Sequence, residues 1–225
     1  MNKLYLVRHG ENLANLTKEF SYRYVDYSLT PKGRLQAQQT AAYFRDKSIH
    51  EIYSSPLKRA IETATIIGQE LGILPVVMEN FREINVGDLE LEPVSADTWE
   101  RHNRIFFQWI AGNADLCFPG GEDYRSLWGG LSGGIGQIIA GKSGRNILVV
   151  GHGGIFSTTI KDLCPNLDLE RMLANPSNNC SITEIDIELV GDRPAGKLVR
   201  WSSYDHLSGE AAELVSGLPT ENDFR

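Results

Sequence analysis

The chain has 225 residues, of which 41% are hydrophobic and 23% charged, a composition typical of a soluble globular protein with a substantial core. Its net charge of −7 argues against a nucleic-acid or anionic-membrane surface, so a site for an anion must gather cations locally. The three cysteines form no close pairs, no apolar run approaches the roughly 18–20 residues of a membrane span, and no signal-like segment precedes the first strand. We therefore expect a cytoplasmic protein with no nucleic-acid or membrane partner.

Strand-like and helix-like segments alternate along the chain. The strand-like runs cover residues 3–7, 51–54, 75–78, 146–150, 181–189 and 197–203. Helices are expected from Pro31, with Thr30 as cap, and after Ser55 as the next cap. Further helices are expected at about 97–111, 123–140 and 155–163. This alternation predicts an α/β fold, a three-layer α/β/α sandwich around a mostly parallel central sheet.

The chain shows no internal repeat and no linker, so we expect a single α/β domain over residues 1–204. Residues 85–121 interrupt the alternation of strands and helices, and we interpret them as an insertion over the functional site. Residues 205–225 are polar and glycine-rich, and we expect them to form a loosely held surface tail.

Two of the apolar strands end in a histidine followed by glycine. The sequence LVRHG leads into His9 and Gly10, and VVGHGG leads into His152. Ligands of such sheets bind beyond the carboxyl ends of the strands, so we expect both histidines in one site. The Arg8 guanidinium offers a planar fork of donors for carboxylate or phosphate oxygens, and a neutral imidazole beside a bound phosphate can attack phosphorus.

Arg59, in the segment SSPLKRAIETA, is a further candidate for binding an anion. It follows a strand and is expected in the first turn of a helix, where free N–H groups and the helix dipole favour negative charge. Together with Arg8 and His152 it would supply the local cations that this acidic chain needs. The alternative interpretation is a solvated arginine.

Five segments occur in a diagnostic order, namely LVRHGENLAN, DYSLTPKGRLQAQ, SSPLKRAIETA, PGGE and VVGHGG. Together they resemble the signatures of the histidine phosphatase superfamily, which has the phosphoglycerate-mutase-like fold. The resemblance implies a metal-independent phosphomonoesterase that uses no cofactor and acts on a small phosphorylated metabolite. It also implies that His9 is the nucleophile that becomes phosphohistidine.

The same resemblance implies a phosphate-binding set. Its members would be Arg8, Arg59, His152, Gly153 and Asn15. Asn12 stands where relatives often have threonine, and either side chain can donate a hydrogen bond to phosphate. Alternatively, Asn12 is a loop residue that bonds its own backbone.

A general acid must protonate the leaving oxygen and later activate water. The resemblance places Glu83 in this role, although the tryptophan and second glycine usual after this point are missing from the sequence GDLEL. Asp88 and Glu90 are therefore kept as alternatives. His152 is followed by glycine, which argues against the branch that takes its acid from a His-Asp pair.

The nearest alternative function is a phosphoglycerate-mutase-type phosphotransferase, which grips a three-carbon acid with an arginine pair. Arg101 and Arg104 lie three residues apart and could contact an anionic substrate, but a solvated helix face is the simpler interpretation. The neighbouring aromatic residues are interpreted as core, namely Trp99, Phe106, Phe107 and Trp109.

Two alternatives lie outside this chemistry. A metal hydrolase could use His9, His152 and Glu83 as ligands, although two arginines beside the metal would oppose a divalent cation. A non-catalytic protein that binds phosphorylated ligands is the other alternative, and only the altered sequence after Glu83 favours it. A homodimer is possible because dimers are common among relatives.

Overall fold

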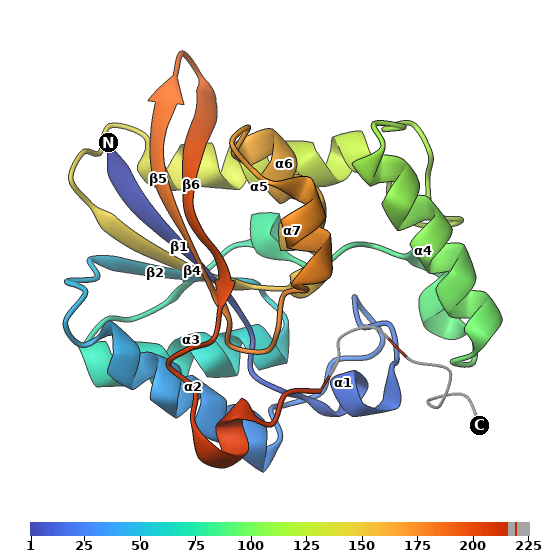
Figure 1. Ribbon diagram of the computed structural model, residues 1–225, viewed down its shortest axis with the longest axis horizontal. Coiled ribbons are helices and arrows are strands. Elements are labelled where there is room, and N and C mark those ends of the chain that lie inside the picture. The colour runs from blue at the N-terminus through green and yellow to red at the C-terminus, as the bar shows by residue number, and fades with distance from the viewer. Residues whose placement is uncertain (216–218, 220–225) are drawn as a thin grey trace.

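The computed structural model describes residues 1–215 and 219 and contains a six-stranded sheet in the order β3-β2-β4-β1-β5-β6 (Figure 1). The strands are β1 (Asn2–Arg8), β2 (Glu51–Ser54), β3 (Val76–Val77), β4 (Asn146–Gly151), β5 (Ile182–Val190) and β6 (Arg193–Ser203). Strands β3, β2, β4 and β1 pair in parallel, whereas β5 runs antiparallel to both β1 and β6. The mostly parallel sheet expected from the sequence is therefore confirmed.

Helices cover both faces of the sheet (Figure 1). One face packs against α2 (Pro31–Phe44) and α3 (Lys58–Leu71), and the other against α5 (Tyr124–Ile139) and α6 (Gly153–Leu163). Alternate residues of β1 serve the two layers, because Tyr5 and Val7 join the first core while Leu4 and Leu6 join the second. The three-layer α/β/α sandwich is confirmed.

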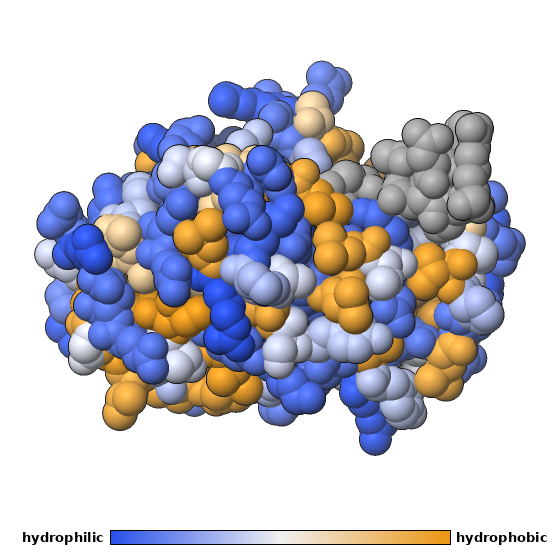
Figure 2. Space-filling model, turned by 90° about the horizontal axis from the view of Figure 1, so that it is seen from below, coloured by the Kyte–Doolittle hydropathy of each residue, from blue (hydrophilic) through white to orange (hydrophobic). Residues whose placement is uncertain are grey.

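Shorter or peripheral elements complete the described part of the chain. They are α1 (Leu13–Thr17), η1 (Glu79–Phe81), η2 (Gly87–Leu91), α4 (Ala96–Ile110), α7 (Leu169–Ala174) and η3 (Gly209–Ala212). The sequence did not predict α1 or α7. Figure 2 views the molecule from the side of α1 and α2 and shows apolar residues in separate patches between polar ones. Within the described residues, no helix combines the length and the apolar character needed to cross a membrane.

The two expected helix caps have different outcomes. The Thr30 side chain accepts the Gly33 N–H at 3.0 Å at the start of α2, as predicted. The prediction for Ser55 was wrong, because α3 begins only at Lys58 and Leu57 occupies its cap position. The carboxylate of Asp26, from a distant loop, accepts the Lys58 N–H at 3.0 Å. This contact leaves the Ser55 hydroxyl available for another partner.

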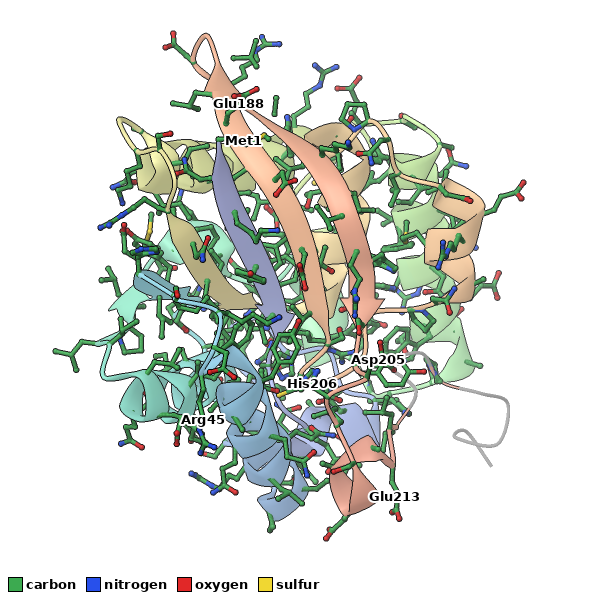
Figure 3. The ribbon with its side chains drawn as sticks, turned by 60° about the vertical axis from the view of Figure 1, so that its left-hand side comes forward. Met1, Arg45, Glu188, Asp205, His206 and Glu213 are labelled. Carbon is green, nitrogen blue, oxygen red and sulfur yellow. The ribbon has the colours of Figure 1, made fainter. Side chains whose placement is uncertain are left out.

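The first half of the C-terminal segment packs against α2, contrary to the loose tail that we expected. Leu207 and Ala211 are buried, and the Ala211 carbonyl accepts a hydrogen bond from the Gln36 side chain at 3.2 Å. His206 lies beside α2 and bonds Thr40 at 3.0 Å (Figure 3). The expectation for residues 216–218 and 220–225 falls outside the described residues.

Candidate active site

The site lies where three neighbouring parallel strands end. Arg8 pairs with Gly151 in register, and the His9 N–H donates to the Gly151 carbonyl at 3.0 Å. On the other side of β4, the Ser55 N–H donates to the Val150 carbonyl at 2.9 Å. The ends of β1, β2 and β4 thus bring the His9 and His152 rings to a centroid separation of 5.2 Å.

His9 is buried, and its hydrogen bonds determine its tautomer. Its Nδ1 lies 2.8 Å from the Gly10 carbonyl, which can only accept, so Nδ1 carries the proton. The Nε2 lone pair accepts a hydrogen bond from Arg59 Nε at 3.1 Å. Burial, followed by the charges of Arg59 and Arg8, holds the pKa of His9 well below its ordinary value. The imidazole is therefore neutral, with a nucleophilic nitrogen directed at a guanidinium.

The Arg59 side chain is held by the loop before α2. Its terminal nitrogens donate to the hydroxyl and the carbonyl of Ser21, both at 2.8 Å, and one lies 3.8 Å from the Asp26 carboxylate. Burial lowers the pKa of Arg59 to about 10, so the guanidinium stays charged at neutral pH. The structure therefore places a fixed cation at the nucleophilic edge of His9.

Arg8 is buried beside the start of α6 and donates to the Ser177 carbonyl. A Cβ atom at Gly153 would lie 3.3 Å from Arg8 Nε, so a glycine at this position leaves the guanidinium uncrowded. Burial lowers the pKa of Arg8, and the nearby Glu83 carboxylate opposes that shift. Gly153 is thus a neighbour of the arginine and the first residue of α6.

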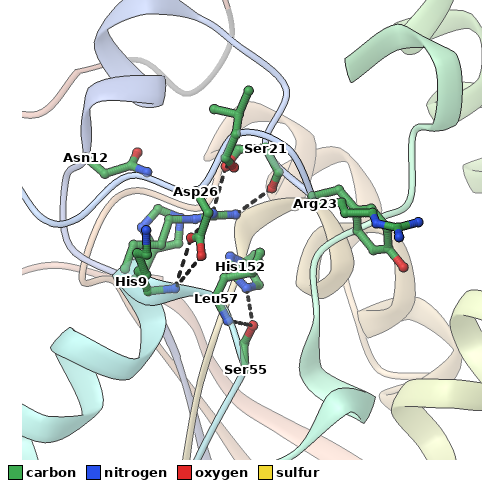
Figure 4. Close-up of polar contacts among 12 residues, drawn as sticks. His9, Asn12, Ser21, Arg23, Asp26, Ser55, Leu57 and His152 are labelled. Atoms are coloured by element: carbon green, nitrogen blue, oxygen red, sulfur yellow. Dashed lines mark hydrogen bonds and ion pairs between the residues drawn. The ribbon is translucent and has the colours of Figure 1, made fainter. Parts of the chain in front are cut away.

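His152 is fully buried, and its Nε2 forms a hydrogen bond of 2.6 Å with the Ser55 hydroxyl (Figure 4). Ser55 Oγ also accepts the Leu57 N–H at 3.3 Å. When the serine hydroxyl donates to Nε2, the imidazole proton lies on Nδ1. Burial and the charge of Arg59 hold the pKa of His152 well below its ordinary value.

Asn12 and Asn15 form a reciprocal cap at the start of α1. Each side-chain oxygen accepts the backbone N–H of the other, at 3.2 Å and 3.1 Å. Asn15 Oδ1 also accepts a hydrogen bond from Asn179 at 3.0 Å. Asn12 Nδ2 is buried against the cavity without a partner among the described residues. Both interpretations of Asn12 thus find support, because its oxygen bonds the backbone while its nitrogen remains a donor.

Three buried nitrogens at this site have no hydrogen-bond partner within the described part of the chain. They are Arg8 Nε, Asn12 Nδ2 and His152 Nδ1. A buried donor without a partner costs about 1–3 kcal/mol, so such groups rarely gather without a ligand to satisfy them. With the Arg59 guanidinium, they form a site suited to the oxygens of a buried anion.

Of the three carboxylates considered for the acid, Glu83 alone lines the cavity. Its two oxygens accept the N–H groups of Gly154 and Ile155 at 3.0 Å and 2.8 Å, at the start of α6. Glu90 instead accepts four backbone N–H groups of the loop 22–25 through one oxygen, at 2.7 to 3.1 Å. Asp88 is exposed beside Gly120. Glu90 therefore holds a loop, and Glu83 faces the site.

A cavity of about 260 Å³ extends from these polar groups to an apolar wall. Of the four aromatic residues that we had interpreted as core, Trp109 and Trp99 are buried in the core. Trp99 also lines the cavity, together with Phe106 and Phe107. Arg101 and Arg104 do not line it. They pair with Glu92 and Asp97, and with Glu100, on the outer side of α4.

Within residues 1–215 and 219, no group of three or more His, Cys, Asp or Glu side chains is arranged to hold a metal ion. The combination of His9, His152 and Glu83, considered from the sequence as a metal site, is therefore not formed. The same polar groups are instead arranged around a site for an anion.

Sequence reasoning missed residues that position the site. Ser55 had been interpreted only as a helix cap, although its place after a strand in the segment SSPL marks the same sheet edge as His9. Asn179 links the His9 carbonyl to Asn15, with hydrogen bonds of 3.0 Å to each, across more than 160 residues of sequence. No local pattern indicated that contact.

A neutral, buried imidazole beside two charged guanidiniums, at the carboxyl ends of parallel strands, is an arrangement suited to a phosphate-like anion next to a nucleophilic nitrogen. The sequence profile described as the histidine phosphatase superfamily (branch 1) matches residues 4–201. The chain therefore belongs to the histidine phosphatase superfamily.

Individual relatives agree with this assignment. The chain is 30% identical over 187 residues to the "Uncharacterized phosphatase PhoE" of Bacillus subtilis, covering 82% of this chain and 90% of that one. The phosphoserine phosphatase of Entamoeba histolytica, solved with 3-phosphoglyceric acid, is 26% identical with a TM-score of 0.72, covering 92% and 100% of the two chains. The mycobacterial glucosyl-3-phosphoglycerate phosphatase solved with VO3 shares the fold at 21% identity, with a TM-score of 0.75 over 90% and 100%.

Proposed function

We propose that the protein is a phosphomonoesterase that works through a phosphohistidine on His9, without a metal ion, on a small phosphorylated metabolite. The carrying observation is the arrangement around His9 Nε2. The hydrogen bond from Nδ1–H to the Gly10 carbonyl places the ring proton on Nδ1, so Nε2 carries a lone pair. Nε2 lies 3.1 Å from Arg59 Nε, and buried polar nitrogens without a partner among the described residues lie around it. This arrangement supports attack on a bound phosphoryl group.

In the first half-reaction, the phosphoryl oxygens bind the guanidiniums of Arg8 and Arg59, the Asn12 amide and the Nδ1–H of His152. The phosphate takes over the Arg59 Nε–H, which releases the lone pair of His9 Nε2. That lone pair attacks phosphorus in line with the ester oxygen, and the P–O bond breaks. The donors stabilise the charge on the equatorial oxygens.

Glu83 serves both half-reactions as the proton-transfer group. Its carboxylic acid gives a proton to the leaving oxygen, so the alcohol departs neutral. Its carboxylate then takes a proton from the water that attacks the phosphohistidine, and inorganic phosphate and free His9 result. The hydrogen bonds from Gly154 and Ile155 fix the carboxyl group at the cavity wall.

Asn15 and Gly153 support the same site in different ways. Asn15 lines the cavity, but its oxygen is engaged with Asn12 and Asn179, so we assign it to positioning the loop as well as to binding. Gly153 contributes space beside Arg8.

The mutase alternative is less well supported by the cavity wall. Arg101 and Arg104 are engaged in ion pairs outside the cavity, so α4 offers no arginine for a carboxylate. A cytoplasmic location and a homodimer stay predictions. The first is consistent with the free thiols of Cys117, Cys164 and Cys180.

The test is hydrolysis of p-nitrophenyl phosphate in excess chelator by the wild type and by His9→Ala. The proposal expects activity that survives the chelator and is lost in the variant. Chelator-sensitive activity, or full activity of His9→Ala, would contradict it. Binding of inorganic phosphate without turnover of any ester would indicate the non-catalytic alternative. Isomerisation of 3-phosphoglycerate with its bisphosphate, faster than hydrolysis, would indicate the mutase.

A further inference from the structure

The part of the cavity beyond the phosphate site is lined by rings. Phe20, Trp99, His102, Phe106 and Phe107, here called the aromatic wall, come from the loop after α1 and from α4. Phe20 lies 4.6 Å from Trp99 and is stacked on His102 at 5.1 Å. Ile84, Val86, Met172 and Leu173 add aliphatic surface to the same cavity. The group that carries the phosphate must therefore lie against apolar and aromatic side chains.

The only ionisable ring of the aromatic wall, that of His102, is uncharged at neutral pH. Burial lowers the pKa of His102 to about 4, and its Nδ1 contacts the Asn103 side-chain oxygen at 3.1 Å. The packing of His102 against Phe20, Trp99 and Phe118 accounts for that burial. The imidazole consequently offers a flat neutral surface and gives a substrate carboxylate no cation.

Positive charge in the described cavity lining is concentrated at the phosphate end. Apart from Arg8 and Arg59, the described residues of the lining include one cationic side chain, Lys18, whose ammonium donates to the Asn15 carbonyl at 3.1 Å. Glu19 lines the cavity next to Lys18 and brings the opposite charge. A carboxylate on the leaving group would have to be desolvated against rings, with no cation beyond Lys18 among the described lining residues of that end, which is unfavourable.

From this arrangement we infer that the preferred substrates are phosphomonoesters whose leaving group is apolar and uncharged, in particular one that carries an aromatic ring, rather than carboxylate-bearing esters. The inference rests on the proposed phosphatase function and concerns the substrate class of the same site. A flat ring fits between side chains that already stack on one another, and each ring face offers both apolar contact and offset stacking. The preference arises from the residues that α4 places over the phosphate site.

The test compares kcat/KM for benzyl phosphate with that for 3-phosphoglycerate and O-phosphoserine. All three are alkyl esters, so the reactivity of the leaving oxygen is similar and recognition decides the ratio. We expect benzyl phosphate to be preferred by about 10²-fold, the size of discrimination that an apolar pocket gives. A preference for either carboxylate-bearing ester would overturn the inference and leave the phosphatase function intact. If none of the three esters were hydrolysed, both the proposed function and this inference would be contradicted.

Variants of Phe106 test whether the preference for aromatic leaving groups arises from the aromatic wall. Phe106→Ala should lower kcat/KM for benzyl phosphate by about 10-fold, mainly through KM, and should lower kcat/KM for O-phosphoserine by a much smaller factor. Phe106→Leu, which keeps apolar volume, should restore part of the loss and guards against a folding defect. The matched control is Gln108→Ala, an exposed position on the same helix, which should change neither substrate. Equal losses on both esters in Phe106→Ala and Phe106→Leu would overturn the assignment.

Discussion

The two ends of the cavity are built in different ways. At the phosphate end, Arg8, His9 and His152 are attached to the ends of buried parallel strands, and backbone register fixes their relative positions. At the other end, the aromatic wall is carried by α4 and the loop after α1, outside the sheet. The first end is charged and densely hydrogen-bonded, whereas the second is apolar.

On this account, the phosphate end carries out the reaction and the aromatic wall selects the substrate. A phosphoryl group is the same in every monoester, so its site can be part of the rigid sheet edge, where small displacements are prevented. The leaving group varies between substrates, and its proposed contacts lie on α4, a helix outside the sheet that can change without altering the strands. Variants at the phosphate end should therefore affect all esters, and variants at the wall should affect some.

The largest effect is expected at the nucleophile. His9→Ala removes the group that accepts the phosphoryl and should lower kcat by about 10⁴-fold or more for every ester, with the fold retained. Steady-state kinetics and circular dichroism provide the measurement. His50→Ala, at an exposed histidine outside the site, is the control and should keep full activity. If His9→Ala kept measurable activity and ranked the esters by kcat/KM in the same order as the wild type, the nucleophile would be another residue.

Replacing Glu83 and Glu90 one at a time should distinguish the proposed acid from the carboxylate that holds the loop. Glu83→Gln should lower kcat for benzyl phosphate by about 10³-fold, and the first step with p-nitrophenyl phosphate by less, because nitrophenolate leaves without a proton. Glu90→Gln should instead lower the denaturation midpoint, because its carboxylate accepts four loop N–H groups. Unchanged turnover of benzyl phosphate by Glu83→Gln would show that the acid is another group.

The Arg59 guanidinium should matter for binding and for rate. Arg59→Ala should lower kcat/KM by about 10²-fold on all esters and weaken inhibition by inorganic phosphate. Arg59→Lys should recover only part of this loss, because an ammonium lacks the planar fork of donors through which the guanidinium contacts His9 Nε2 and Ser21. Arg101→Ala is the matched control, since this arginine pairs with Glu92 outside the cavity. A loss confined to one ester would place Arg59 in leaving-group recognition instead.

A last effect concerns stability against pH. Burial lowers the pKa of His9, His102, His152 and His206, so the unfolded chain binds more protons below about pH 6.5. The free energy of unfolding should therefore fall on acidification from pH 7 to 5, by up to about 1.4 kcal/mol per pH unit and proton. Glu122, whose pKa is raised to about 7 by burial, acts in the opposite direction. Urea denaturation across this range measures the slope, and a flat or inverted profile would contradict these shifts.

The sheet and the two histidines could be predicted from sequence because their signals are local. Continuous apolar runs mark buried strands, and a change to Arg-His-Gly marks where a strand ends. The partners that position the site could not be predicted, because they depend on contacts between distant segments. Asn179 contacts the His9 carbonyl, and Ser55 contacts His152, only because the fold brings their strands side by side.

The aromatic residues of α4 show a second limit of the sequence pattern. Periodicity predicts which face of a helix is apolar, but it does not distinguish a face buried in the core from one that lines a cavity. Trp109 and Phe106 look alike in the sequence, yet the first is in the core and the second lines the cavity. The packing of the C-terminal residues 205–215 on α2 was missed for the same reason, because two buried residues among polar ones leave only a weak pattern.

The central claim is that His9 Nε2 carries the phosphoryl group between the two half-reactions. The most direct measurement mixes Glu83→Gln with p-nitrophenyl phosphate, quenches in alkali, where phosphohistidine survives, and maps the phosphoryl group by peptide mass spectrometry. This variant should form the intermediate and hydrolyse it slowly, so we predict a burst of nitrophenolate close to one per active site and a single phosphopeptide containing His9. A burst with the phosphoryl group on another residue, or turnover without any phosphoenzyme, would contradict the account.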